Sequence, residues 1–161
     1  MPIQVGETLP LDLKLKEASA SGPADVTVGD VFQGKKVVLF AVPGAFTPTC
    51  SLKHLPGFVE KADAIRGKGV DEIVCLSVND AFVMGAWGDA NGAGGKVRML
   101  ADGNGDLTRA LGLELDASGF GMGKRSQRYA LVATDGKVDA LYVEDGPGLK
   151  VSSADAVLAA L

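Results

Sequence analysis

Cys50 is the residue of this 161-residue chain whose type and position most clearly suggest chemistry. It lies in the segment VPGAFTPTCS, residues 42–51. An apolar run rich in β-branched residues (36–42) comes before it, and a segment with helical polarity and spacing (52–66) follows. Cys50 is therefore expected where a buried strand ends and a helix begins. The free amides and the dipole of a helix start stabilise a negative charge, so the first hypothesis is an activated cysteine nucleophile.

The alternative for Cys50 is burial as a small hydrophobic side chain, which is the commoner fate of a free cysteine. Its neighbours favour the nucleophile. Two prolines, a glycine and two threonines shape the approach to the sulfur, and a core cysteine needs no such shaping. Thr47 lies three positions before Cys50, close enough for its hydroxyl to contact the sulfur or a substrate oxygen at the start of the helix.

The spacing Pro43-x-x-x-Thr47-x-x-Cys50 resembles the active-site motif of the peroxiredoxins, and PGAFTPTCS resembles their type II branch. The resemblance implies that Cys50 attacks peroxide, that Pro43 shields it and that Thr47 holds the peroxide. The family also uses one distant arginine, and Arg128 falls at the expected place. The resemblance covers most of the chain and includes the runs KHLPGF (53–58), SVND (77–80), ADG (101–103), LGL (111–113) and RSQRYA (125–130).

Arg128 stands at the start of an expected strand, where a solvated arginine is the ordinary interpretation. A guanidinium close to a thiolate would stabilise the negative charge and polarise a peroxide O–O bond, because it cannot lose its own charge. Together with the resemblance, this favours a catalytic Arg128.

His54 is the single histidine and lies four positions after Cys50, on the same face of a helix. A Cys–His hydrolase pair is one interpretation. Such pairs are normally joined across a fold, whereas this histidine would have to reach back over one turn. We therefore expect a structural or interface role for His54.

Cys75 lies inside an apolar strand segment, which predicts inert burial. Type II peroxiredoxins that resemble this chain often carry a cysteine here, and whether Cys75 resolves oxidised Cys50 stays open at this point. Some relatives have a resolving cysteine after a Gly-x-Gly-Leu stretch near the C-terminus, but residues 146–152, GPGLKVS, offer none. This departure favours an external thiol, glutathione with glutaredoxin or thioredoxin, over an intramolecular disulfide.

Composition predicts one globular domain over residues 1–161, with 47% apolar and 22% charged residues. Sixteen basic and twenty acidic residues give a net charge of −4 without a basic cluster, which argues against nucleic acid or an anionic membrane as partner. No apolar run approaches the ~20 residues of a membrane helix. The first residues lack the features of a signal peptide, and the two cysteines suit a reducing compartment, so we expect the cytoplasm. The cysteines do not have the spacing of a zinc site, so we expect no metal.

The expected elements form an α/β fold with a central mixed sheet flanked by helices. This order matches the thioredoxin-like fold, which the resemblance also implies. We expect a break in the helix 52–66 at Pro56, a helix after Asn79-Asp80, a loop at 119–123 and a hairpin turn at Asp135-Gly136. The expected strands are an edge strand or hairpin near 11–15, a possible pairing at 26–28, and strands at 36–42, 73–78, 97–101, 129–134 and 138–143; short helices are expected at 106–111 and from Ser152-Ser153 to the end of the chain.

The function implied by the resemblance is a thiol peroxidase. Hydrogen peroxide or an alkyl hydroperoxide would enter a shallow pocket lined by Pro43, Phe46 and Thr47, and convert Cys50 to a sulfenic acid that a thiol then reduces. No metal or organic cofactor is implied. Thioredoxin-like disulfide exchange is one alternative, although that motif has a cysteine where Thr47 stands. A redox-sensing or chaperone-like binding module that uses the same sulfenic acid is the other.

The family commonly forms homodimers through surfaces beside the active site. Candidate residues for such a surface are Phe46, His54, Phe82 and Phe120. The single tryptophan, Trp87, is expected to be a core or interface aromatic residue, with the wall of a pocket as a further possibility.

Overall fold

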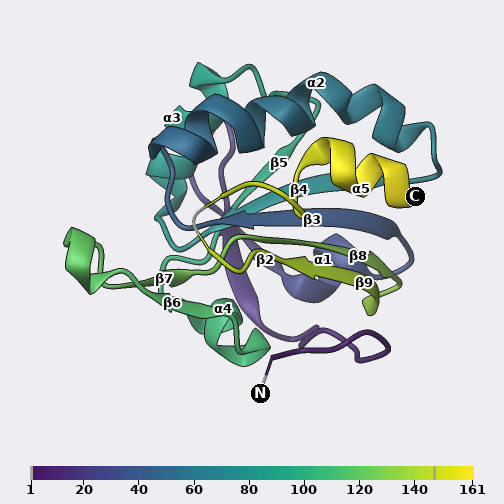
Figure 1. Ribbon diagram of the computed structural model, residues 1–161, viewed down its shortest axis with the longest axis horizontal. Coiled ribbons are helices and arrows are strands. Elements are labelled where there is room, and N and C mark those ends of the chain that lie inside the picture. The colour runs from purple at the N-terminus through teal and green to yellow at the C-terminus, as the bar shows by residue number, and fades with distance from the viewer. Residues whose placement is uncertain (1, 147) are drawn as a thin grey trace.

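A mixed sheet with helices on both faces forms the centre of the computed structural model, which describes residues 2–146 and 148–161 (Figure 1). The strand order is β2-β1-β5-β4-β3-β8-β9. These strands are β1 (Lys14–Glu17), β2 (Ala24–Thr27), β3 (Lys36–Val42), β4 (Glu72–Ser77), β5 (Arg98–Ala101), β8 (Tyr129–Thr134) and β9 (Lys137–Val143). The mixed sheet and its flanking helices confirm the α/β prediction.

The centre of the sheet holds the parallel strands β3, β4 and β5, with β8 antiparallel beside β3. Every residue of β3 after the first is buried. Covering on both faces explains why β3 reads as an unbroken apolar run instead of an alternating one. The C-terminal end of β3 therefore delivers the following loop, and Cys50, to one edge of a rigid sheet.

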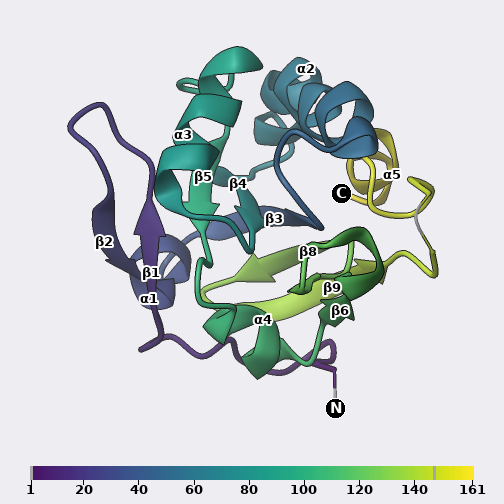
Figure 2. The same ribbon diagram turned by 90° about the vertical axis from the view of Figure 1, so that its left-hand side faces the viewer.

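Helices cover the sheet in two layers (Figures 1 and 2). One face carries the π-helix η1 (Cys50–His54) and the α-helices α2 (Leu55–Arg66), α3 (Ala81–Ala90) and α5 (Ala154–Ala160). The other face carries α1 (Val28–Phe32) and α4 (Asp106–Leu111). A separate apolar cluster fills each interface between sheet and helices. Of the helices within the described residues, none has the length and apolar character needed to span a membrane.

The expected break at Pro56 takes the form of a change in helix type. Residues 50–54 form a π-helix in which the amide of Leu55 donates to the carbonyl of Cys50, and an α-helix continues from Leu55. Pro56 lacks an amide hydrogen and so cannot continue an i→i−4 pattern through this point. The turn that holds Cys50 is thus distinct from α2 but continuous with it.

The short helix α1 was not expected, because the sequence around residues 26–28 was interpreted as a possible strand pairing. Thr27 ends β2 and caps α1 through a capping box with Asp30: each side chain accepts a hydrogen bond from the other residue's amide, at 3.0 and 2.9 Å. The pattern Thr-x-x-Asp is the sequence signal that could have predicted this helix.

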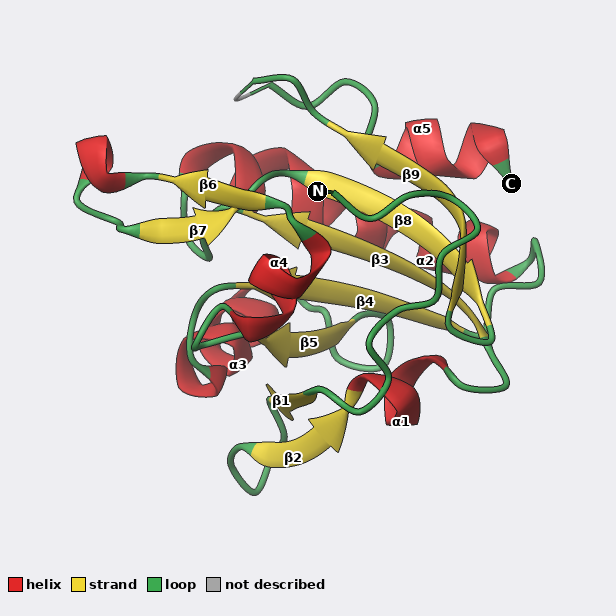
Figure 3. Cartoon of the chain, turned by 90° about the horizontal axis from the view of Figure 1, so that it is seen from below, coloured by secondary structure: helices red, strands yellow, loops and turns green. Residues whose placement is uncertain are grey.

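The expected loop at residues 119–123 is the tip of a separate antiparallel hairpin, formed by β6 (Glu114–Asp116) and β7 (Lys124–Ser126). A single 3₁₀ turn, η2 (Ser118–Phe120), lies within it. The hairpin projects beyond the edge of the main sheet (Figure 3). The sequence predicts that both Phe120 and Met122 are exposed in this loop. Phe120 is exposed, but the prediction for Met122 is wrong, because its side chain is half-buried against the loop that follows β3.

The hairpin of β8 and β9 confirms the prediction made from Asp135-Gly136. Both residues have positive φ angles, 51° and 79°, as a two-residue turn of this kind requires. Because β8 pairs with β3, this hairpin also brings the residue just before β8, Arg128, next to the end of β3.

Candidate active site

Cys50 lies in the first turn of the helix that follows β3, as the sequence predicts. Helical backbone begins at Pro48, and the first amide to bond back is that of Ser51, which donates to the carbonyl of Thr47 at 2.9 Å. The amide of Cys50 therefore belongs to the group that a helix start leaves without an intrahelical acceptor. The side chain of Cys50 is fully buried.

The loop between β3 and Cys50 is held in one shape by hydrogen bonds. The amide of Ala45 donates to Oδ1 of Asn79 at 3.0 Å, and the hydroxyl of Thr47 donates to the carbonyl of Gly44 at 2.7 Å. Phe46 has a φ of 63°, which is rare for an aromatic residue. Such strain persists only where the surrounding structure enforces it, and it concentrates at functional sites.

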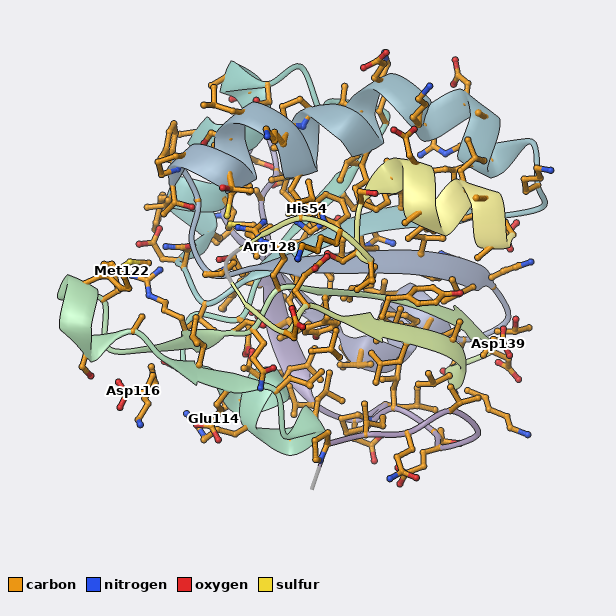
Figure 4. All side chains as sticks on the ribbon, in the orientation of Figure 1. His54, Glu114, Asp116, Met122, Arg128 and Asp139 are labelled. Carbon is orange, nitrogen blue, oxygen red and sulfur yellow. The ribbon has the colours of Figure 1, made fainter. Side chains whose placement is uncertain are left out.

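Arg128 contacts both Cys50 and His54. Its Nη2 donates to Sγ of Cys50 at 3.1 Å, and its Nη1 donates to Nδ1 of His54 at 2.8 Å. Figure 4 shows Arg128 and His54 side by side between the sheet and α2. Arg128 lies 78 positions after Cys50 in the chain, and the pairing of β8 with β3 brings the two together.

The charge of Arg128 is buried without a carboxylate. Its side chain is only 6% exposed, and within the described residues no ion pair includes it. A buried cation that lacks a counter-charge is costly. The sulfur of Cys50 can supply that counter-charge as a thiolate, because a charge-assisted hydrogen bond then joins the two groups. The site therefore offers a sulfur anion a cationic neighbour that is also a hydrogen-bond donor.

His54 holds Arg128 in place as a neutral imidazole. Its Nε2 lies 2.9 Å from the carbonyl oxygen of Ser152, which can only accept, so Nε2 carries the proton and Nδ1 accepts from Arg128. Burial, together with the charge of Arg128, lowers the pKa of His54 to about 3. The structural role expected for His54 is confirmed. An interface role is wrong, because the side chain is completely buried.

Glu144 fixes the carbonyl that His54 contacts. Its Oε2 accepts hydrogen bonds from the amides of Lys150, Val151 and Ser152, at 2.9, 2.8 and 2.8 Å, and from the hydroxyl of Ser152 at 2.7 Å. The loop after β9 is thereby tied down behind the imidazole. Sequence reasoning missed this support, since no local motif marks a glutamate that binds amides six to eight positions ahead.

Cys75 lies in the middle of β4, opposite Phe40 on one side and Met99 on the other. It is fully buried in the same apolar cluster as Cys50, and both cysteines are free thiols. Burial raises the pKa of the Cys75 thiol well above its usual range, and nearby Cys50 adds to that effect. Burial in the strand was expected from the sequence, and it keeps Cys75 protonated.

Trp87 is a core residue that anchors the turn of Cys50. Its ring is fully buried, and its Nε1 donates to the hydroxyl of Ser51 at 2.9 Å. The ring of Phe46 lies over it, with 6.5 Å between the ring centres, and stays 55% exposed. Of the three residues expected to line a substrate pocket, Phe46 is thus on the surface, while Pro43 and Thr47 are half-buried.

Two cavities in the described part of the chain do not have Cys50 in their lining. One of about 390 Å³ is formed by β1, α3 and β5 and is walled mainly by small residues. The other, about 130 Å³, lies between α4 and the β6–β7 hairpin and includes Arg109, Lys124 and Arg125.

The buried imidazole makes stability depend on pH. In the unfolded chain a histidine takes up a proton below pH ~6.5, whereas folded His54 stays neutral down to a pH of about 3. The stabilisation is complete above the unfolded pKa, and it is lost as the pH falls, by up to about 1.4 kcal/mol per pH unit. Urea unfolding at pH 7, 6 and 5 measures this slope, and His54→Gln is expected to have a shallower one. Equal slopes in the two proteins would contradict a neutral, buried His54.

Three comparisons place the chain among known proteins. The family model described as Redoxin matches residues 4–158. The chain is 50% identical to Peroxiredoxin-2B of Arabidopsis thaliana over 160 residues, which cover 99% of both proteins. It is 54% identical to Peroxiredoxin-2E-2, chloroplastic, of Oryza sativa subsp. japonica, over 96% of this chain and 73% of the relative. The crystal structure of reduced Prx3 from Vibrio vulnificus in complex with hydrogen peroxide has a TM-score of 0.93 and 52% identity, over 98% of each chain.

Proposed function

The chain belongs to the peroxiredoxins, a branch of the redoxin family, and on this premise we propose that Cys50 is its peroxide-reducing cysteine. The fold is thioredoxin-like and the activity is that of a thiol-dependent peroxidase. The observation that supports Cys50 is its 3.1 Å contact with the buried guanidinium of Arg128. Cys75, the other thiol, lacks such a contact among the described residues and is kept protonated by burial.

In the proposed reaction the Cys50 thiolate attacks the nearer oxygen of the hydroperoxide. The O–O bond breaks, and the leaving oxygen takes a proton and departs as water or an alcohol. Cys50 is oxidised to a sulfenic acid while the peroxide is reduced. Arg128 and the free amides of the first helical turn hold the reactants in line and stabilise the charge that develops on the leaving oxygen.

Arg128 has donors left for this task, because a guanidinium carries five N–H groups and His54 and Cys50 take up two of them. Its Nη1 and Nη2 are occupied by His54 and Cys50, whereas its Nε has no partner among the described residues. A buried N–H without an acceptor is costly in the resting protein. A bound peroxide oxygen would satisfy it, which is why we assign Arg128 to peroxide binding as well as to the thiolate.

Thr47 and Pro43 are proposed to complete the peroxide site. The hydroxyl of Thr47 donates its hydrogen to the carbonyl of Gly44, so the lone pairs of its oxygen remain free to accept a hydrogen bond from the O–H group of the peroxide. Pro43 is half-buried at the end of β3 and would shield the sulfur from water. Phe46 is proposed only as the outer rim of the approach, because its ring is at the surface.

The sulfenic acid is proposed to be reduced by an external thiol, glutathione with glutaredoxin or thioredoxin. Cys50 is buried, so its turn must open for a protein thiol to reach it. The π-helix, residues 50–54, is a short unit that ends just before Leu55 and Pro56, and we propose that it unwinds while α2 stays folded. Cys75 is less able to serve as the partner, since β4 is paired on both sides at the centre of the sheet.

Cys75→Ser is expected to keep full peroxide turnover with glutathione and glutaredoxin. A disulfide needs Cα atoms within about 7 Å of each other, so one of the two cysteines must be able to move toward the other. Cys75 lies in the central strand β4, which cannot move without breaking its hydrogen bonds to the strands on both sides. Mass spectrometry of wild-type protein, treated with one equivalent of peroxide and then glutathione, should find sulfenic acid and then a mixed disulfide at Cys50. A dominant Cys50–Cys75 disulfide, with loss of turnover in the variant, would identify Cys75 as the resolving cysteine.

A homodimer is proposed, with Phe46, Phe82 and Phe120 at its interface. These aromatic side chains are 55%, 73% and 86% exposed, which is unusual for residues of this size. Sedimentation velocity across micromolar concentrations tests the assembly.

The two free, buried thiols suit a reducing compartment, and we propose the cytoplasm. The continuous sheet supports one domain over residues 1–161.

A further inference from the structure

Arg125 is a second guanidinium beside the active-site loop, and the mechanism above does not use it. An ideal Cβ placed on Gly44 would lie 3.5 Å from Nη1 of Arg125 and 3.0 Å from the methyl carbon of Met122. Both side chains come from the β6–β7 hairpin, whose Met122 side faces that loop (Figure 4). The hairpin therefore presents a cation at the margin of the Cys50 site.

The guanidinium of Arg125 is oriented but not neutralised. Its Nε donates to the carbonyl of Met122 at 3.0 Å, which sets the direction of the side chain. Within residues 2–146 and 148–161, neither terminal nitrogen takes part in a hydrogen bond or an ion pair. Arg125 is half-buried. An oriented fork of N–H donors in such a position suits a carboxylate, which can accept two parallel hydrogen bonds.

The cavity of about 130 Å³ has Arg125 among its lining residues. Three of its lining residues are cations, Arg109, Lys124 and Arg125, and one is an acid, Glu114. Lys124 and Arg109 also pair with Asp116 and Asp106, at 3.3 and 2.6 Å, which leaves Arg125 as the cation of this lining that has no carboxylate partner among the described residues. At ~30 Å³ per water-sized group, the volume holds about four such groups. It fits a carboxylate end and not a whole tripeptide.

Two lining residues link this cavity to the active-site loop. Arg125 lies against Gly44, as described above, and Val78 also lines the cavity. The next residue, Asn79, accepts the amide of Ala45 in the active-site loop. A molecule whose carboxylate occupied this cavity would therefore extend along that loop toward Cys50.

We infer that Arg125, with Lys124 and Arg109, forms a carboxylate-binding subsite for a molecule that reacts at Cys50. Glutathione fits this description, since it carries two carboxylates and the thiol that the proposed reaction requires. A hydroperoxide that carries a carboxylate shares the same chemistry. The kinetic part of this inference rests on the proposed function of Cys50, whereas binding to the subsite does not.

A binding measurement that involves no reaction comes first. Calorimetry with Cys50→Ser protein and S-methylglutathione should show binding that Arg125→Gln weakens about tenfold, the scale of one hydrogen bond to a charged group. The dimethyl ester of the same compound should bind both proteins equally weakly. Glu114→Gln should strengthen binding of the acid, because it removes the opposing charge. Lys68→Gln, which removes the same charge just beyond the C-terminal end of α2, should have no effect.

A kinetic measurement then identifies the source of the carboxylate. In otherwise wild-type protein, Arg125→Gln should raise the KM for glutathione about tenfold with little change in kcat, and should not alter the KM for glutathione diethyl ester. Arg125→Lys should recover part of the loss, since it restores the charge but not the fork. If Arg125→Gln instead raises the KM for linoleic acid hydroperoxide but not the KM for its methyl ester, the result supports the subsite and assigns it to the peroxide.

The inference is overturned if Arg125→Gln changes the affinity and the KM for the free carboxylic acids and for their esters by the same factor. It is also overturned if Lys68→Gln weakens binding as much as Arg125→Gln does, because the effect would then be one of net charge. If Cys50→Ser retains peroxidase activity while the carboxylate still binds through Arg125, the proposed function fails and the subsite stands. The two results are thus distinguishable.

Discussion

Cys50→Ser is expected to reduce peroxide consumption to the uncatalysed rate of the thiol reductant alone. A serine hydroxyl is not ionised at neutral pH and is a poor nucleophile toward peroxide, so no sulfenic acid can form. The replacement is nearly isosteric, and its oxygen can still accept the hydrogen bond from Arg128. The measurement is peroxide turnover with glutathione and glutaredoxin in excess.

Folding of the Cys50→Ser variant is checked by urea unfolding and by the near-ultraviolet signal of Trp87, which contacts the neighbouring Ser51. Cys75→Ser is the matched control, because it removes the other buried thiol from the same apolar cluster. Turnover that survives in Cys50→Ser would show that another residue reacts with peroxide. Loss of turnover in both variants, with Cys50 still forming a sulfenic acid in Cys75→Ser, would point to a resolving role for Cys75.

Arg128→Ala is expected to slow the reaction of the protein with peroxide by at least about tenfold and up to about 10³-fold, the scale for removing one oriented donor. The variant loses the counter-charge of the thiolate and the donor available to the peroxide. Stopped-flow measurement of sulfenic acid formation isolates this step from reduction by thiol.

Arg128→Ala also leaves Nδ1 of His54 without a donor in a buried site, which costs about 1–3 kcal/mol of stability. Urea unfolding separates this cost from the change in rate. Arg128→Lys keeps the charge but can contact only one of the two partners, so an intermediate rate is expected. A wild-type rate in Arg128→Ala protein that is folded would exclude Arg128 from the reaction.

The sequence by itself determined the elements whose signals are local. The apolar run of β3 follows from burial on both faces, Asp80 caps α3 by accepting the amide of Val83, and Asp135-Gly136 supplies the turn of the β8–β9 hairpin. Each signal depends on residues within a few positions of one another. The same holds for Cys50, since the motif that marks it is contiguous and ends at the start of its helix.

The tertiary structure alone decided how the cysteine is supported. Arg128, His54 and Ser152 form one chain of contacts to Cys50, and Arg125 approaches Gly44 from strand β7 of another hairpin. These contacts join positions far apart in the chain. They exist because β8 pairs with β3 and because the β6–β7 hairpin projects past the sheet edge. No local propensity encodes such distances, since they result from how the whole sheet and its loops pack together.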